Sequence, residues 1–319
     1  MSKLYSLFAI LGIERLAWKA SGDSRLRILA YHGVCDDHIS SEAWVPKHFV
    51  ATAVFEEQVR YLCENASIMH LAEAVERLRA GSLPRRAVVL TFDDGYANNL
   101  YKVLPILEKY RAPATVFIST AYVERALLFP FDRLRLIKIE KQGDHAVLQS
   151  LVEYKSHSLD AVTRAIEASW SSVASKLTRD QIEALRPLTL DELKRLNDHD
   201  LITIGAHSHW HCILGNETRE RRAQEITQSV NLVRQWTGLQ ECPFSYPNGQ
   251  RNDYDEEDMR VLRSLNVRTA VSGIAGINGA TSDPLDLKRL PVGIYHVGHS
   301  FAAEVVGFRN LVRSATLSR

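Results

Sequence analysis

Short apolar runs recur along the chain, and each ends in polar or glycine-bearing residues. Most are followed by a segment whose apolar residues lie three and four positions apart, which predicts amphipathic helices, most clearly at residues 55–62, 70–78 and 98–110. Alternating strands and helices are typical of βα units around a parallel sheet. The predicted strands are residues 27–31, 87–92, 114–119, 201–206, 243–246, 269–271 and 288–292.

The pattern changes between about residues 122 and 187, where a long and mostly helical stretch carries charged faces. Residues 140–144 read Glu-Lys-Gln-Gly-Asp and predict a turn inside it. No alternation typical of a strand interrupts this stretch. We therefore interpret it as an insertion on an α/β barrel, with a separate small domain as the alternative.

Composition narrows the function classes only a little. Hydrophobic residues make up 45% of the chain and charged residues 24%, as in an average soluble globular protein. The net charge of +1 argues against a nucleic-acid partner held by a broad basic surface. The four cysteines are scattered without a CxxC pair, which favours buried free thiols. Cys212 follows His211 directly and is an alternative soft ligand, although the surrounding pattern supplies other donors.

The N-terminal segment has an apolar stretch at residues 7–13, preceded by one lysine and followed by no clear small-residue cleavage site. It fits a signal peptide poorly, and an amphipathic helix that packs on the barrel or touches a membrane surface fits it equally well. Nothing else approaches the run of about 20 apolar residues that crosses a bilayer. We therefore expect no transmembrane segment; a cytoplasmic location is favoured, with periplasmic and membrane-peripheral ones left open.

The strand predicted at 87–92 ends in two adjacent carboxylates, Asp93 and Asp94, followed by Gly95. The carboxyl ends of parallel strands are where α/β barrels place their active sites. Because successive side chains on a strand point to opposite sides, one carboxylate can bind a cation while the other faces a water. An ordinary strand end capped by a turn is the alternative interpretation of this segment taken alone.

The strand predicted at 201–206 ends in three imidazoles within five positions, His207, His209 and His211. Imidazole and carboxylate together suit zinc, cobalt, nickel or iron, and three protein ligands with an open position are typical of a catalytic metal site. The sequence leaves open whether His209 replaces one of the other two as a ligand.

A third segment, Pro-Phe-Ser-Tyr-Pro-Asn-Gly at residues 243–249, predicts a strand followed by a turn. Its functional interpretation is that rigid backbone N–H groups after Pro247 point at a developing oxyanion. Contacts to the oxyanion or the substrate are therefore expected at Tyr246, Pro247 and Asn248.

These three segments, Thr-Phe-Asp-Asp-Gly at 91–95, His-Ser-x-x-His at 207–211 and Phe-Ser-Tyr-Pro-Asn-Gly at 244–249, resemble in order the first three motifs of the polysaccharide deacetylase family with its NodB homology domain. The opening Leu-Ala-Tyr-His-Gly-Val at 29–34 is similar to its amino-terminal part. The resemblance implies a distorted (β/α) barrel of about seven units at 26–300, between an N-terminal helical segment at 1–25 and a C-terminal tail at 301–319.

Carried over residue by residue, the resemblance implies that Asp93 is the general base and that Asp94, His207 and His211 bind a divalent cation, zinc first. Many members have an arginine in the third motif that orients the base, and here Ser245 stands in its place. Many also have a late Leu-x-His motif that supplies the general acid. The tail offers His296 only as a weak candidate, because the spacing differs.

The implied activity is hydrolysis of the N-acetyl group of an acetylated sugar polymer or oligosaccharide. Two alternatives stay open: a catalytically impaired carbohydrate-binding barrel, and a metallohydrolase of non-sugar amides. Glycosidic-bond hydrolysis needs two carboxylic acids that flank the bond, and an adjacent Asp pair beside histidines fits metal binding better. The expected partner is an acetylated carbohydrate; protein partners and the native glycan are not indicated.

Overall fold

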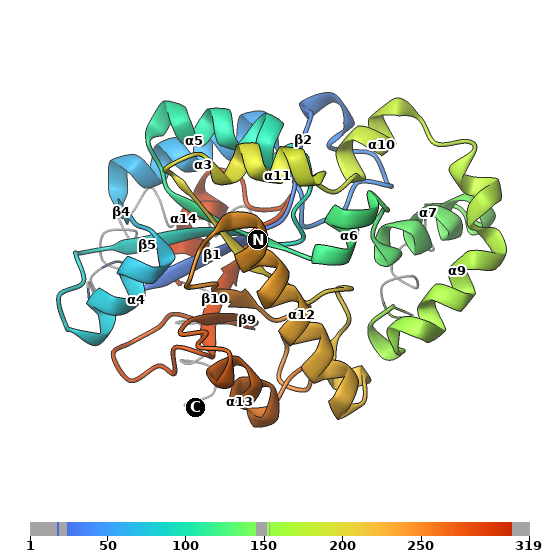
Figure 1. Cartoon of the computed structure of the whole chain (residues 1–319). Coiled ribbons are helices and arrows are strands. Elements are labelled where there is room, and N and C mark those ends of the chain that lie inside the picture. Colours follow the sequence, from blue (N-terminus) through green and yellow to red (C-terminus); the bar gives the residue numbers. More distant parts are fainter. Residues whose placement is uncertain (1–17, 19–23, 145–151, 153, 308–319) are drawn as a thin grey trace, which may run out of the picture.

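A computed structural model describes Trp18 and residues 24–144, 152 and 154–307 (Figure 1). Seven parallel strands in it form a closed ring, because β1 (Arg27–Tyr31) pairs with both β5 and β10. Leu29 of β1 lies opposite Leu290 on one side and Leu90 on the other. The remaining strands of the ring are β5 (Ala87–Phe92), β6 (Ala114–Ile118), β7 (Ile202–Ala206), β8 (Phe244–Ser245), β9 (Ala270–Ala275) and β10 (Leu287–Pro291).

The seven-stranded (β/α) barrel and its seven predicted strands are thus confirmed. β1, β5 and β6 are buried along their whole length, as expected for parallel strands covered on both faces. The barrel is distorted at β8, which has two residues and one register pair with β7, and between β9 and β10, where the register shifts. The sequence predicts a strand over residues 243–246, whereas β8 contains two of these four residues.

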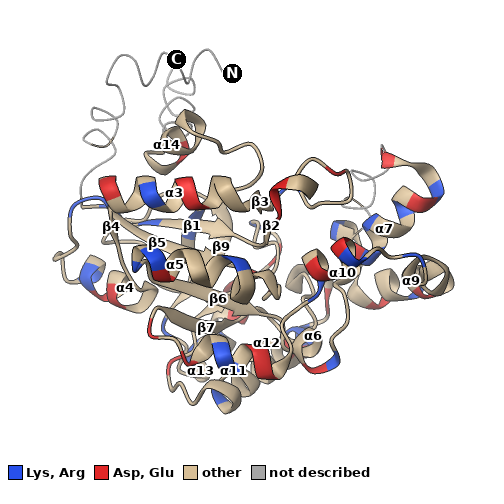
Figure 2. Ribbon diagram, turned by 90° about the horizontal axis from the view of Figure 1, so that it is seen from above, with Lys and Arg blue, Asp and Glu red and all other residues tan. Residues whose placement is uncertain are grey.

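Helices cover the outside of the ring. Those around the barrel are α3 (Thr52–Asn65), α4 (Leu71–Arg79), α5 (Leu104–Tyr110), α11 (Leu190–Asn197), α12 (Arg219–Thr237) and α13 (Glu256–Ser264). The helix predicted at 98–110 is divided: a π-helical turn at Asn99–Val103 precedes α5, since Pro105 has no N–H to continue the α-helical ladder. Figure 2 shows acidic and basic residues interspersed on these helices, for example along α3.

Short strands add to the sheet edges. β4 (Ser67–Ile68) pairs with β5, while β2 (Val34–Cys35) and β3 (Val50–Ala51) form a small separate ladder. The loop between β2 and β3 carries a 3-10 turn at Asp37–Ile39, and another such turn lies at Leu214–Asn216.

The stretch predicted as an insertion is helical, and both overall views place α7, α9 and α10 to one side of the barrel (Figures 1 and 2). Its helices are α6 (Thr120–Arg125), α7 (Pro130–Gln142), α9 (Leu159–Ala174) and α10 (Arg179–Leu185). α7 ends in the predicted turn, with Gly143 at φ 84° as its C-cap. The insertion packs through a second apolar cluster onto Phe49 and Tyr96 of the barrel loops. The boundaries assigned from sequence stay predictions.

The predicted terminal segments lie mostly outside the described residues. Of the N-terminal segment, Trp18 is buried, with the guanidinium of Arg27 4.4 Å from its ring centroid. α14 (His299–Val305) crosses the predicted boundary of the C-terminal tail and buries Phe301. No helix in the described part of the chain is long and apolar enough to span a membrane. Cys63 is exposed on α3, unlike the other three cysteines, so the expectation of buried thiols is wrong for this one.

Candidate active site

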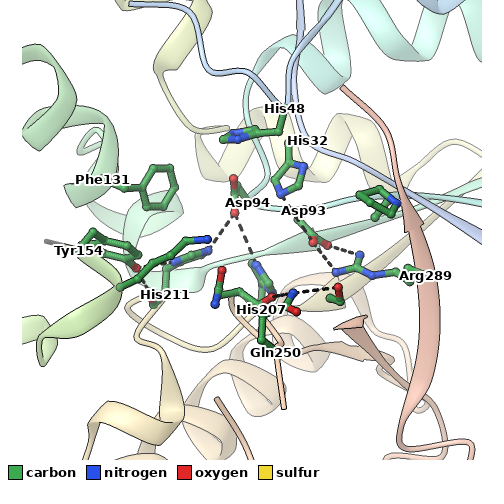
Figure 3. Close-up of a pocket in the computed structure, with 15 residues that line it drawn as sticks. His32, His48, Asp93, Asp94, Phe131, Tyr154, His207, His211, Gln250 and Arg289 are labelled. Carbon is green, nitrogen blue, oxygen red and sulfur yellow. Dashed lines mark hydrogen bonds and ion pairs between the residues drawn. The ribbon is translucent and has the colours of Figure 1, made fainter. Parts of the chain in front are cut away.

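A cavity of about 270 Å³ opens where the strands end, and the predicted Asp and His residues line it (Figure 3). Asp93 and Asp94 follow β5, and His207 follows β7. The fold therefore brings together segments that are more than a hundred positions apart in the sequence, because parallel strands present their carboxyl ends at one face of a barrel.

Asp94, His207 and His211 form a compact and buried group. The Oδ1 atom of Asp94 lies 3.5 Å from Nε2 of His207 and 3.1 Å from Nε2 of His211. One ligand atom from each of the three residues lies within 4.8 Å of the others. Burial would raise the pKa of Asp94, but the imidazoles of His207 and His211 beside its carboxylate hold the pKa well below its ordinary value. The spatial convergence of these three side chains is that of a three-ligand metal site.

Each of the two imidazoles is oriented by a hydrogen bond at its other nitrogen. Nδ1 of His207 lies 2.7 Å from the carbonyl oxygen of Ser245, and Nδ1 of His211 lies 2.8 Å from the hydroxyl of Tyr154. A carbonyl oxygen can only accept, so Nδ1 of His207 carries the proton and Nε2 of the neutral ring keeps a lone pair toward Asp94. Such outer contacts are what fixes the tautomer of histidines that ligate metals.

The donor set therefore fits a divalent cation. Oδ1 of Asp94 is buried and has no hydrogen-bond partner in the described part of the chain, although such a group normally finds one. The Nε2 atoms of both imidazoles face it. Carboxylate and imidazole donors suit zinc, cobalt, nickel or iron.

Asp93 is held by an arginine that the sequence analysis did not identify. Nη1 and Nη2 of Arg289, on β10, donate to Oδ1 and Oδ2 of Asp93 at 2.8 and 2.6 Å. The hydroxyl of Ser245 donates to Oδ1 at 3.1 Å, and Nε of Arg289 is fixed by the carbonyl of Ser272 at 2.8 Å. Burial raises the pKa of Asp93, yet Arg289 outweighs it and lowers the pKa to about 2.

The arginine missing from the third motif is thus replaced from another strand. Ser245 has not taken over its role alone; it hydrogen-bonds both Asp93 and Nη2 of Arg289. The sequence contains a signal for this: Arg289 lies inside the strand predicted at 288–292, Lys-Arg-Leu-Pro-Val, and a charge on a buried strand needs a partner.

A comparison with known families agrees with this geometry. A family model described as polysaccharide deacetylase matches residues 80–270. The chain belongs to the polysaccharide deacetylase family. The family predicted from the three motifs is therefore confirmed.

Named relatives of this deacetylase-family chain cover part of it. Poly-beta-1,6-N-acetyl-D-glucosamine N-deacetylase of Staphylococcus aureus is 30% identical over 122 residues, 38% of this chain and 41% of that protein. The Staphylococcus epidermidis protein of the same name is 28% identical over 123 residues, again 38% and 41%. The matched stretch thus spans less than half of these curated relatives.

Solved structures show the same fold. The Streptococcus pyogenes deacetylase PplD has a TM-score of 0.61 at 18% identity, with 88% of this chain and 98% of that chain covered. IcaB from Ammonifex degensii has a TM-score of 0.61 at 16% identity, with coverages of 89% and 98%.

The third segment of this deacetylase-family barrel contributes less than expected. Asn248 lines the cavity at φ 57°, with its side-chain amide donating to Asp253 at 2.6 Å. Tyr246 and Pro247 do not line it. Tyr246 is a core residue, whose ring stacks on Tyr254 at 3.9 Å and whose hydroxyl donates to the carbonyl of Leu285.

Two other histidines considered from sequence point elsewhere. The ring of His296 lies outside the cavity, 3.7 Å from Glu304 of α14, and its Nδ1 accepts from the backbone of Gly293. His209 turns away from the ligands: its Nδ1 is 2.8 Å from the hydroxyl of Thr120, and burial lowers its pKa to about 4. Neither ring belongs to a described group that could hold a metal.

Several cavity residues were missed because they lie on loops and in the insertion. His32 follows β1, and its Nε2 lies 4.0 Å from Oδ2 of Asp93; its ring centroid is 4.3 Å from that of His48. His32, His48 and Asp94 also place one ligand atom each within 4.8 Å of one another. Tyr154 reaches the site from the insertion, where no sequence pattern marked it. His32 sits in the family-like opening, which was the available signal.

Proposed function

We propose that this protein is a metal-dependent N-deacetylase that hydrolyses the acetamide groups of an N-acetylated sugar polymer or oligosaccharide. The observation that carries the proposal is the convergence of Asp94, His207 and His211 at a cavity where a separate carboxylate, Asp93, is clamped by Arg289. A β-1,6-linked N-acetylglucosamine polymer is the first substrate to test, since the named relatives carry that activity in their names. We propose zinc as the cation, with cobalt, nickel and iron as alternatives.

Asp94, His207 and His211 would hold the cation. A divalent cation there supplies Lewis acidity, which polarises a carbonyl oxygen and lowers the pKa of water to about 7. All three side chains are buried, which strengthens the electrostatic contacts among them. Asn248 at the rim is available to contact the substrate.

Asp93 takes the proton of the attacking water on its carboxylate. The guanidinium of Arg289 keeps Asp93 ionised at neutral pH and fixes the plane of its carboxylate, because the paired hydrogen bonds define one orientation. The same clamp makes Asp93 a weak base. A proton on Asp93 is therefore held loosely and passes readily to a stronger acceptor nearby.

His32 is the acceptor that the cavity offers. Its Nε2 is 4.0 Å from Oδ2 of Asp93, so a movement of about 1 Å brings the two atoms within hydrogen-bond distance. Burial lowers the pKa of His32, which leaves the ring neutral and able to take the proton. The sugar amine must receive a proton as it leaves, because an amide anion is a poor leaving group. One proton then moves from water through Asp93 and Nε2 of His32 to the amine nitrogen.

The test is Asp93→Asn. This variant keeps the size of the side chain but cannot take a proton, so acetate release from N-acetylglucosamine oligomers should be abolished while the zinc content of the purified protein stays at the wild-type level. Near wild-type activity would remove Asp93 from its role. Wild-type protein that binds zinc but releases no acetate from any acetylated glycan would favour the carbohydrate-binding alternative, and release only from small amides would favour the non-sugar hydrolase.

A further inference from the structure

The helical insertion contributes a side chain to the metal site itself. Tyr154 lies between α7 and α9, is buried, and points its hydroxyl at His211 (Figure 3). The hydroxyl oxygen is 2.8 Å from Nδ1 of His211 and 2.6 Å from the carbonyl oxygen of the same residue. One atom of the insertion therefore contacts both the ring and the backbone of a ligand.

These two contacts fix which nitrogen of His211 carries a proton. The carbonyl oxygen can only accept, so the single hydroxyl proton of Tyr154 is donated to it. The hydroxyl oxygen must then accept from Nδ1, which places the ring proton on Nδ1. Nε2 keeps its lone pair, and this is the atom that faces Oδ1 of Asp94 at 3.1 Å.

The backbone contact has a separate consequence. His211 has φ 53°, in the left-handed region that non-glycine residues occupy at a cost of about 1 to 3 kcal/mol. The hydroxyl of Tyr154 holds the carbonyl of this residue in place. Phe131 of α7 packs on the same pair, with ring centroids 5.0 Å from His211 and 5.4 Å from Tyr154. The insertion thus contacts the imidazole through the ring of Phe131 and, at Nδ1, through the hydroxyl of Tyr154.

The chain on either side of these contacts is fastened as well. The side-chain amide of Asn216 donates to the carbonyls of Lys155 and His157 at 3.0 and 3.1 Å, and Glu217 accepts from the backbone N–H of Leu159 at 2.7 Å. The segment that follows Tyr154 therefore runs along the loop that follows His211.

We propose that Tyr154 is a positioning residue of the metal site and that the insertion, through it, sets the tautomer and backbone conformation of His211 before any cation binds. This inference rests on the metal site of the proposed function. The insertion would then contribute to cation affinity as well as lining the cavity.

The experiment compares Tyr154→Phe with Tyr122→Phe in the full-length protein, with zinc alone as the probe. Tyr122 is a matched control, since it is also buried in the aromatic cluster and its hydroxyl donates at 3.3 Å to the carbonyl of Trp210, one residue before His211, without touching a ligand ring. Zinc Kd is measured by competition with a chelating dye. Loss of an outer contact of this kind weakens metal affinity by about 10- to 100-fold. We expect that loss for Tyr154→Phe and a change below about threefold for Tyr122→Phe.

A second measurement uses only the wild-type protein, so its result does not depend on whether a variant folds. In zinc-free wild-type protein labelled with ¹⁵N-histidine, long-range ¹H–¹⁵N spectra should show His211 protonated at Nδ1; protonation at Nε2 alone would overturn the inference. Equal zinc affinity of Tyr154→Phe and the wild type, or an equal loss in both variants, would also overturn it while leaving the deacetylase proposal standing. Wild-type protein that binds no zinc would instead overturn the metal site on which both rest.

Discussion

Replacing Arg289 by methionine tests whether a residue outside the three motifs controls the pKa and orientation of Asp93, the proposed general base. Arg289 is 3% exposed and makes two hydrogen bonds to Asp93. Methionine fills much of the same space without a charge. In the variant the carboxylate of Asp93 stays buried, and the hydroxyl of Ser245 is the contact that remains to it from the present set.

The size of the effect follows from the pKa of Asp93. That pKa is about 2, against an ordinary value of 3.8, because Arg289 outweighs the burial that would raise it. That lowering corresponds to about 2 kcal/mol, since one pKa unit is about 1.4 kcal/mol. Without the arginine, the largest contribution that lowers the pKa of Asp93 is gone and His207 and His32 are left to oppose burial, so the pKa should rise toward or above 3.8.

The same shift fixes how stability depends on pH. The pKa of Asp93 is lower in the folded than in the unfolded protein, so its stabilisation is fully present above the unfolded value of about 3.9 and is lost as pH falls through about 2. At pH 7 the Arg289→Met variant should therefore lose about 2 to 3 kcal/mol of unfolding free energy, and this loss should shrink below pH 4.

Two assays measure these effects. Urea denaturation at pH 7 gives the free energy of unfolding, and acetate release between pH 3 and 9 gives the profile of kcat/KM. The variant should lose at least about 100-fold in kcat/KM, the scale of general base catalysis, and its acid limb should move to higher pH. Arg289→Lys is the matched control, because lysine keeps the positive charge but lacks the planar guanidinium. In this variant the acid limb should lie close to its wild-type pH, while kcat/KM should stay further below the wild-type value. If Arg289→Met leaves the acid limb unchanged and kcat/KM within twofold of the wild type, Arg289 does not control the proposed base.

Three further predictions follow from the site and its loops. Treatment with a chelator should abolish acetate release and added zinc should restore it; activity that survives complete zinc removal, checked by metal analysis, would contradict the ligand assignment. His32→Gln should lower kcat by about 100-fold and His296→Gln by less than about twofold, since only the first ring lines the cavity; the reverse order in steady-state assays would make His296 the proton donor. Gly249→Ala should lower the free energy of unfolding by about 2 kcal/mol in urea titrations, because Gly249 has φ +62° and an added Cβ would lie 2.5 Å from the backbone nitrogen of Gly273; a loss below about 0.5 kcal/mol would count against this.

The sequence was sufficient for the strands and for the grouping of the three proposed cation ligands, for one physical reason. Buried parallel strands are continuous apolar runs, and the polar residues that follow them directly are carried to one face of the barrel. Asp94, His207 and His211 could therefore be assigned from their positions after two such runs. The insertion was recognised by the same logic, as the region where strand-like runs are absent.

The contacts that orient these residues could not be predicted in the same way. Arg289 and Asp93 are 196 positions apart, and their pairing depends on the closure of the ring by β1 and β10. Tyr154 reaches His211 from a helical stretch whose packing on the barrel has no periodic signal. The motif also gave no indication of where the ring of Tyr246 lies: the residue follows the two-residue strand β8, and its ring stacks on Tyr254 in the core.

Closure of the ring bears on how this protein can be dissected. The segment that matches the family model, residues 80–270, contains Asp93 and all three ligands but neither β1 nor β10. A recombinant fragment with those limits would retain every motif and still lack Arg289 and His32, with two sheet edges left unpaired. Under the proposed mechanism, activity therefore requires the complete barrel, and minimal fragments should be designed from strand pairing instead of motif limits.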